Sequence, residues 1–412
     1  MGRIQELDGL RAIAILLVLA AHFAPHDRLL ANVLGLGWCG VDLFFAISGF
    51  LITDILLALR KTEAPFRTFY WRRTLRIFPP YYLILALIVL LAFLHAEPVN
   101  YREVARHALF LSSATPGLLK VAFARLACHV SAPLQLAPKQ GGYSLLQFKD
   151  CLGIYWSLSV EELFYLTWAP IVLKGSRRAI LFCSVAALLV CPLLRGLAHS
   201  TPFVDESIGF VFRFDSLAAG GCVALLFAGV DHGLVQSRSA ARWLIAVMIV
   251  AGTGLFGLAE ICGVFHGVDV RTRLGFSIWG FSLLAILCAS IVGACARWSG
   301  TLGPLSSILR STGAANLGKV SYMMYLIHLP TYVVIQLLFV KLFGRNALVT
   351  STGLQALCGI AATAGTIGFA RLSWSYFEGP IMRMRNVAFP MLRTDRDLPV
   401  PRTIDQSARV CA

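Results

Sequence analysis

The chain has 412 residues, of which 58% are hydrophobic and only 14% are charged, and its mean hydropathy is +0.74. A soluble domain carries about a quarter charged residues, so this composition excludes an ordinary soluble protein and indicates one that is covered by lipid. The formal net charge of +15 at pH 7 does not indicate a nucleic-acid partner, because the basic residues lie in short stretches between apolar runs, where they orient membrane spans.

Apolar runs that are long enough to cross a bilayer recur along the whole chain. A transmembrane helix needs about 20 mostly apolar residues. The sequence therefore predicts an all-α, polytopic transmembrane helix bundle of about ten spans. The spans are expected at residues 9–25, 34–58, 79–96, 154–173, 179–197, 208–229, 243–260, 275–295, 317–340 and 352–376.

The segments between the spans predict the topology and the domains. When the loops are assigned alternately to the two sides, most of the Lys and Arg residues fall on the side of the two termini, which places both in the cytoplasm. Residues 1–380 are expected to form one transmembrane domain. Its long extracytoplasmic loop, at about 97–153, is expected to contain a short helix near 104–113. Residues 381–412 are predicted to be a disordered cytoplasmic tail.

The first predicted span contains two polar residues at a helical spacing. Arg11 and His22 are 11 positions apart in LDGLRAIAILLVLAAH, which is about three helical turns, so they share a face about 16 Å apart along the axis. Charged groups inside a span are costly and are therefore candidates for function. The alternative is that Arg11 extends to the inner interface and His22 lies at the outer edge.

A second basic cluster is predicted to precede the third span, in FRTFYWRRTLRIFPPYY. Arg73 and Arg76 are three residues apart, so their guanidinium groups could hold a phosphate together through paired hydrogen bonds. Pro79 and Pro80 are expected to mark where the span begins. The alternative is that these arginines serve only as a topology signal.

The fourth predicted span opens with two adjacent glutamates in YWSLSVEELFYLTW. Ser157, Glu161 and Tyr165 follow one another at intervals of four residues, which predicts a polar stripe on one helical face. Glu162 lies on another face and is expected to point toward an edge or a loop. A structural ion pair with an arginine is the alternative role for either glutamate, and the sequence leaves open which of the two is functional.

Other polar candidates are scattered over the later spans. Asp42 in GVDLFFAISGFLIT and His328 in SYMMYLIHLP are single polar groups in apolar surroundings, for which structural and functional roles are equally open. Arg213 and Asp215, in FRFDSLAAGG, can pair with each other or with other spans. No CxxC pair or Cys/His cluster is present, so the sequence predicts neither a metal site nor a permanently bound cofactor.

Taken in order, these segments resemble the acyltransferase 3 family of integral membrane O-acyltransferases, of the type that acetylates bacterial cell-surface polysaccharides. The resemblance rests on seven segments in the family's order, namely LDGLRAIA, GVDLFFAISGFLIT, RTLR, WSLSVEELFY, RFDSLAAGG, SYMMYLIHLP and SWSYFEGP. Two positions depart from the family pattern. Leu163 replaces a usual glutamine, and Gly379 replaces a common basic residue.

The resemblance implies a multi-pass protein of the bacterial inner membrane. Such a protein would transfer an acyl group, most often acetyl, from cytoplasmic acyl-CoA to a hydroxyl of an envelope or exported glycan. Its implied partners are acyl-CoA as a donor substrate, a glycan or glycolipid acceptor, and the bilayer. The family's Arg-x10-His element falls on Arg11 and His22, its RxxR element on Arg73 and Arg76, and the glutamate of its WSLSVE motif on Glu161.

These residues suggest a mechanism. Histidine titrates near neutral pH, so His22 could serve as a general base for the acceptor hydroxyl, or carry the acyl group transiently. Arg73 and Arg76 would bind coenzyme A phosphates with help from Arg11, and Glu161 would orient His22 or the acceptor. Two other classes are considered, a secondary transporter of a glycan or lipid-linked intermediate and a non-catalytic scaffold. Acetyl and longer acyl groups, and several envelope glycans, all fit these residues.

Overall fold

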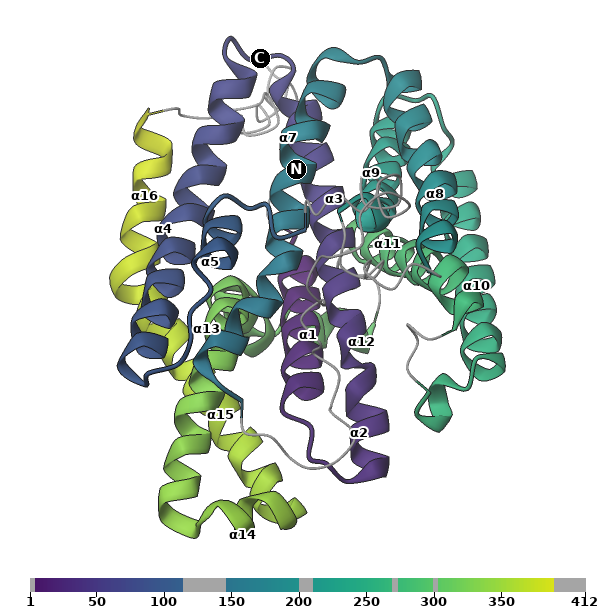
Figure 1. The fold of residues 1–412 in the computed structure, drawn as a ribbon. Coiled ribbons are helices and arrows are strands. Elements are labelled where there is room, and N and C mark those ends of the chain that lie inside the picture. The colour runs from purple at the N-terminus through teal and green to yellow at the C-terminus, as the bar shows by residue number, and fades with distance from the viewer. Residues whose placement is uncertain (1–3, 114–145, 200–209, 269–272, 299–302, 389–412) are drawn as a thin grey trace, which may run out of the picture.

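The computed structural model describes residues 4–113, 146–199, 210–268, 273–298 and 303–388. Over these residues the chain forms a bundle of long helices and no strands (Figure 1). The ten long helices are α1 (Gln5–His22), α3 (Gly40–Leu59), α4 (Pro65–Leu94), α7 (Trp156–Lys174), α8 (Arg177–His199), α9 (Phe210–Asp231), α10 (Ser237–Ile261), α11 (Phe281–Arg297), α13 (Thr312–Phe343) and α15 (Thr352–Ser373). Each of the ten predicted spans coincides with one of these helices, so the all-α membrane bundle is confirmed.

Short helices connect or extend the long ones. They are α2 (Arg28–Gly35), η1 (Leu36–Cys39), α5 (Tyr101–Ala108), η2 (Phe148–Tyr155), η3 (Val264–His266), the π-helix η5 (Phe276–Gly280), α12 (Pro304–Leu309), α14 (Arg345–Thr350), the π-helix η6 (Trp374–Glu378) and α16 (Gly379–Ala388). The helix α5 confirms the short helix expected within the long loop. The first residues of the predicted tail belong to α16, and the rest of that tail lies outside the described residues.

Within the described chain, eight helices are long enough and apolar enough in composition to cross a membrane. The two long helices that are not among them are α1 and α7, which carry Arg11 and the two adjacent glutamates. Both lie inside the bundle, where α1 packs on α13 and α3, and α7 packs on α3 and α9. The charged side chains of Arg11, Glu161 and Glu162 are therefore surrounded mainly by other helices rather than by lipid.

The long helices alternate in direction along the chain. In Figure 1 the N-terminal end of α1 and the C-terminal end of α16 both point toward the upper end of the bundle. This arrangement requires an even number of crossings, which agrees with ten. The assignment of the upper end to the cytoplasm stays a prediction from the distribution of Lys and Arg.

The helix α4 begins earlier than the sequence predicted. It runs without a break from Pro65, which occupies the first turn, through Pro79 and Pro80 to Leu94. Proline at the first helical position has no N–H to leave unbonded, whereas prolines inside a membrane helix are tolerated where neighbouring helices support the backbone. Beside the prolines, α13 contacts α4 through the hydroxyl of Tyr322, which donates to the carbonyl of Ile77 at 3.1 Å. The helix thus begins well before the two prolines, and the arginines before them lie inside it. That the prolines mark the entry to the membrane span stays a prediction.

Glycines allow the central helices to approach closely. A Cβ atom on Gly49 of α3 would lie 1.8 Å from the carbonyl oxygen of Leu217 on α9, and one on Gly318 of α13 would lie 1.8 Å from that of Asp8 on α1. Small residues serve membrane helices in this way, since lipid provides no hydrophobic driving force for their association. The first contact joins α3 to α9, and the second fixes α1 against α13, the two helices that carry His22 and His328.

A buried histidine in α5 predicts an acid-sensitive fold. Burial and the neighbouring charge of Arg106 lower the pKa of His107 from 6.5 to about 4. The unfolded chain takes up a proton below pH 6.5 and the folded chain only near pH 4, so stability falls as the pH drops through this window. The loss is expected to be at most about 3 kcal/mol. Thermal unfolding in detergent between pH 7 and pH 4 measures it.

The substitution His107→Gln removes the titrating ring and is expected to flatten this pH dependence. His266→Gln is a matched control, because the His266 side chain is 70% exposed. An unchanged slope in His107→Gln would assign the acid sensitivity to other groups.

Candidate active site

Arg11 and His22 lie toward opposite ends of α1. Arg11 is partly buried, and its Nη1 lies 3.3 Å from Oδ1 of Asp8 one turn earlier. Ile15 and Val18, on the same helix, are fully buried in the apolar core. His22 is the last residue of α1 and its side chain is exposed. The rise of a helix separates Arg11 from His22 by about 16 Å, so the two residues belong to different levels of the bundle.

At the level of Arg11, Glu161 of α7 accepts two side-chain hydrogen bonds. Ser48 of α3 donates to Oε1 at 2.8 Å, and the Tyr165 hydroxyl donates to Oε2 at 2.9 Å. Hydrogen bonds of this kind are about twice as strong when the accepting carboxylate is ionised as when it is neutral. They fix the orientation of Glu161, and they confirm the polar pairing of Glu161 with Tyr165 that the sequence spacing predicted.

Arg73 of α4 completes this upper group. Its guanidinium carbon lies 4.9 Å from the centre of the Tyr165 ring, and the charges of both Arg73 and Arg11 act on Glu161. Arg73 forms no hydrogen bond with any described residue, and the only one that Arg11 donates is to Asp8. The upper group therefore consists of Arg11, Arg73, Glu161 and Tyr165, with guanidinium N–H groups that can still bind an anion.

The two arginines of the RxxR element face different partners. Arg73 belongs to the upper group, whereas the charge of Arg76 acts on Glu378 at the end of η6. Glu378 is buried and accepts a hydrogen bond from Ser373 at 3.1 Å. The geometry thus groups Arg73 with Arg11, and places Arg76 beside the closing segment of the chain.

Glu162 is enclosed rather than placed at an edge or a loop. Its Oε1 is buried and has no hydrogen-bond partner among the described residues. The tyrosines around it bond elsewhere, since Tyr81 donates to the carbonyl of His107 at 2.9 Å and Tyr322 to that of Ile77. The expectation for Glu162 is wrong because α4 and α13 cover this face of α7, which the pattern of one helix cannot show.

The lower end of α1 holds a pair of histidines. Nδ1 of His22 lies 2.8 Å from the carbonyl oxygen of Val18, so Nδ1 is the donor and Nε2 is left as an acceptor. The ring of His328, on α13, lies 5.0 Å from that of His22, with 67° between the ring planes. His328 is completely buried. It is therefore not an isolated polar group but the neighbour of His22.

Tyr325 connects this pair to α7. Its ring lies 5.7 Å from that of His328, and its hydroxyl lies 2.6 Å from Oγ of Ser157. The structure thus brings Ser157 to the lower level, one turn of α7 away from Glu161. Polar side chains of α1, α4, α7 and α13 thus form a column through the interior of the bundle.

Glu161 does not contact His22 in the part of the chain that the structure describes. Its side-chain partners are Ser48 and Tyr165, and the ring next to His22 belongs to His328. The hypothesis that Glu161 orients His22 is therefore not supported, because the helical rise places the two on different levels.

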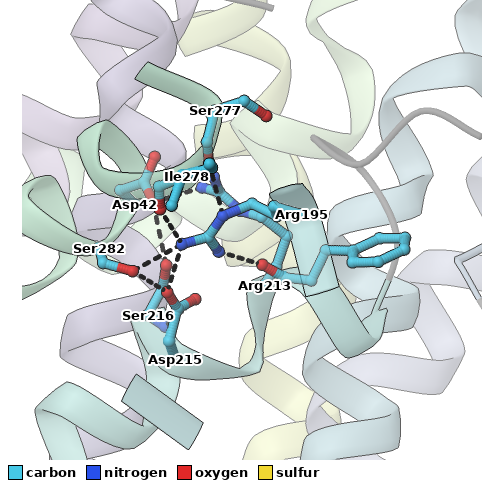
Figure 2. Close-up of polar contacts among 9 residues, drawn as sticks. Asp42, Arg195, Arg213, Asp215, Ser216, Ser277, Ile278 and Ser282 are labelled. Carbon is cyan, nitrogen blue, oxygen red and sulfur yellow. Dashed lines mark hydrogen bonds and ion pairs between the residues drawn. The ribbon is translucent and has the colours of Figure 1, made fainter. Parts of the chain in front are cut away.

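Four charged side chains form a separate buried network among α3, α8, α9 and α11 (Figure 2). Arg213 of α9 pairs with Asp42 of α3, and Oγ of Ser216 also donates to Asp42, at 3.1 Å. Asp215 pairs with Arg195 of α8 at 3.0 Å. Of the two arrangements that the sequence left open, Arg213 and Asp215 adopt the second, in which each pairs with another span.

Arg195 was not among the residues predicted from the sequence, and it is completely buried. Its guanidinium donates to the carbonyls of Ser277 and Ile278 on the π-helix η5, and to Oγ of Ser282 at 2.6 Å (Figure 2). Its position inside an apolar run, in CPLLRGLAH, was a signal that could have found it. All of these partners belong to the protein, so this network holds helices together and lies apart from the column.

Comparison with known proteins identifies the family. The family described as an acyltransferase domain, acyltransferase 3, matches residues 4–371. The chain is 29% identical to the peptidoglycan O-acetyltransferase OatA of Listeria monocytogenes, over 92% of this chain and 56% of that protein. It is 24% identical to the O-acetyltransferase OatA of Staphylococcus aureus, over 94% of this chain and 58% of that protein. The chain thus spans little more than half the length of these relatives. No solved structure matches it.

Proposed function

The chain belongs to the acyltransferase 3 family and is an acyltransferase of a multi-pass membrane bundle, and we propose that it moves an acetyl group from acetyl-CoA to a hydroxyl of an envelope glycan. The family match favours an enzyme over the transporter and scaffold alternatives. The names of the relatives, which are O-acetyltransferases, support acetyl as the group transferred. The bacterial inner membrane is the location that these relatives favour.

The observation that carries the proposal is the polar column. Its upper group offers the guanidinium groups of Arg11 and Arg73, and its lower end offers Nε2 of His22. Guanidinium groups bind phosphate through paired hydrogen bonds, and coenzyme A carries several phosphates. The donor would therefore bind from the upper end, past Arg73 with Arg76 one turn deeper along α4, and the acceptor would approach the exposed side of His22.

The reaction needs a base for the proton of the acceptor hydroxyl. Nε2 of His22 removes the proton from the acceptor hydroxyl while the hydroxyl oxygen attacks the thioester carbonyl carbon. The carbon–sulfur bond then breaks, and the coenzyme A thiolate takes the proton back from His22. His22 as a transient acyl carrier is the alternative, in which its nitrogen attacks first and the hydroxyl attacks the acyl-imidazole.

Peptidoglycan is the acceptor that the Listeria relative favours, since that protein is named a peptidoglycan O-acetyltransferase. An acceptor on the far side of the membrane fits the position of His22, which is the last residue of α1 and so lies at the end of that helix opposite to Gln5. The muramic acid or glucosamine hydroxyls of a glycan strand, or of its lipid-linked precursor, would then approach His22.

Purified protein in lipid nanodiscs, supplied with acetyl-labelled acetyl-CoA and peptidoglycan fragments, tests the proposal. The label is expected in ester linkage on the glycan, and mild base should release it as acetate. Isolated envelope polysaccharide serves as a second acceptor. No ester formed with either acceptor, while the protein remains folded, would contradict acetyl transfer to envelope glycans.

The two glutamates of α7 are expected to differ in their effect on this activity. Glu161→Gln replaces one accepting oxygen by an amide, so either Ser48 or Tyr165 loses its acceptor, and hydrogen bonds to a charged group contribute about 1.5–3 kcal/mol. We expect transfer to fall by about tenfold or more. Glu162→Gln removes a buried carboxylate that has no hydrogen bond at Oε1, and is expected to keep activity within about threefold and to raise the melting temperature.

Labelled acetyl transfer and thermal unfolding of the two purified variants measure these effects. The variants differ by one position on the same helix, so each is the control for the other. An inactive Glu162→Gln protein beside an active Glu161→Gln protein would reverse the assignment of the functional carboxylate.

A further inference from the structure

His328 carries an unbonded nitrogen in the interior of the bundle. Its Nδ1 lies 2.8 Å from the carbonyl oxygen of Tyr325. A carbonyl can only accept, so Nδ1 holds the proton of the neutral ring and Nε2 holds a lone pair. That Nε2 is buried and has no hydrogen-bond partner among the described residues. Native proteins rarely leave a buried acceptor unpaired, and those that do often use the group in catalysis or switching.

Aromatic contacts hold the ring of His328 beside His22, the proposed base. The rings of His22 and His328 are 5.0 Å apart, and the ring of Phe23 lies 6.0 Å from His328. Phe23 stacks on Tyr332 of α13 at 4.8 Å, with 16° between the planes. The end of α1 is thus fixed to α13 by the residue that follows His22, and the two imidazoles keep a defined separation.

The hydrogen bonds of the two histidines explain why Nε2 of His328 is unpaired. Each ring uses Nδ1 as a donor to a backbone carbonyl of its own helix, His22 to Val18 and His328 to Tyr325. Each Nε2 is then an acceptor, so neither ring can donate to the other while both are neutral. The missing donor appears only when His22 gains a second proton, which is what a general base does during turnover.

We propose that His328 is a positioning residue for the transfer, whose Nε2 accepts a hydrogen bond from the ring of His22 after His22 has taken the proton of the acceptor hydroxyl. This inference rests on the proposed function, in which His22 is the base. The proton moves from the hydroxyl to Nε2 of His22, where the lone pair of His328 stabilises it, and then to the departing thiolate. A neutral partner suits this role, because a second positive charge in the bundle would repel the imidazolium.

Two amide substitutions separate the roles of the two nitrogens. The side chain of asparagine can replace Nδ1 as a donor to the carbonyl of Tyr325, whereas that of glutamine reaches the position of Nε2 and can accept there. Transfer of label from acetyl-CoA to glycan is measured with isolated cell envelopes that contain each variant. His328→Asn is expected to lower kcat by about 10- to 100-fold with little change in KM, whereas His328→Gln should keep kcat within about fivefold of wild type.

Thermal unfolding of both variants accompanies the assay, and activity is compared at a temperature below the lower of the two melting points. Wild-type turnover in His328→Asn, or equal losses in both folded variants, would overturn the role of Nε2 and leave His328 as a structural residue. Failure of the proposed function itself would give a different result from failure of the role of His328. It would appear as transfer at the wild-type rate in His22→Ala, or as no transfer by the wild-type protein.

Discussion

Replacing His22 with alanine is expected to lower the rate of acetyl transfer by on the order of 10²–10⁴-fold, the usual contribution of a general base. The side chain is exposed at the end of α1, so its loss leaves no large cavity and the protein should still fold. The rate is measured with labelled acetyl-CoA and a glycan acceptor, on protein whose folding is verified by its melting temperature.

His266→Ala is a matched control, because His266 is an exposed histidine in η3 and lies outside the column. It should retain wild-type activity. Turnover of His22→Ala at the wild-type rate would remove His22 from the mechanism.

A variation of the same experiment separates the two roles considered for His22. Without an acceptor, an acyl-carrier histidine would release one equivalent of coenzyme A in a rapid burst and retain the acetyl label on the protein. A general base would release none. The burst, if present, should disappear in His22→Ala.

The second large effect is expected on stability, from Arg195→Leu. This substitution leaves the carboxylate of Asp215 buried without its cation and removes the donors to the carbonyls of Ser277 and Ile278. Breaking a buried ion pair by removing one partner costs about 3–5 kcal/mol. Lower yield in the membrane and a clearly reduced melting temperature in detergent are the expected measurements.

The double substitution Arg195→Leu with Asp215→Leu is the informative control, because it removes both charges. It should recover part of the lost stability, since apolar residues of similar size can replace a buried ion pair at little cost. A single variant as stable as wild type would mean that the network in Figure 2 contributes little to the association of α8 with α9.

Much of the fold followed from hydrophobic runs. A transmembrane span is recognisable from about 20 mostly apolar residues, without any knowledge of tertiary contacts. Each predicted span accordingly coincides with a long helix. The start of α4 did not follow, because the segment from Pro65 to Ile77 is basic and aromatic. Its helix depends on burial of residues such as Phe69 against other helices, which a local pattern does not contain.

The candidate site was predictable as a set of residues but not as a set of contacts. Spacing along one helix placed Glu161 with Tyr165, which the structure confirms. Spacing says nothing about which helices adjoin, so the pairing of His22 with His328, more than 300 residues apart, was not foreseen. For the same reason Glu162 was assigned to an edge, although α4 and α13 enclose it.

The weak apolar character of α1 and α7 has a consequence for biogenesis. Each charged residue at the centre of a span costs about 2.5–3.5 kcal/mol when the translocon passes a helix into lipid. The helix α1 leaves the ribosome first, yet it packs mainly against α13, one of the last to be synthesised. A nascent chain must therefore hold α1 in the translocon or against α3 until α13 arrives. Chains that end before α13 should accumulate with α1 poorly inserted, and become substrates for membrane quality-control proteases.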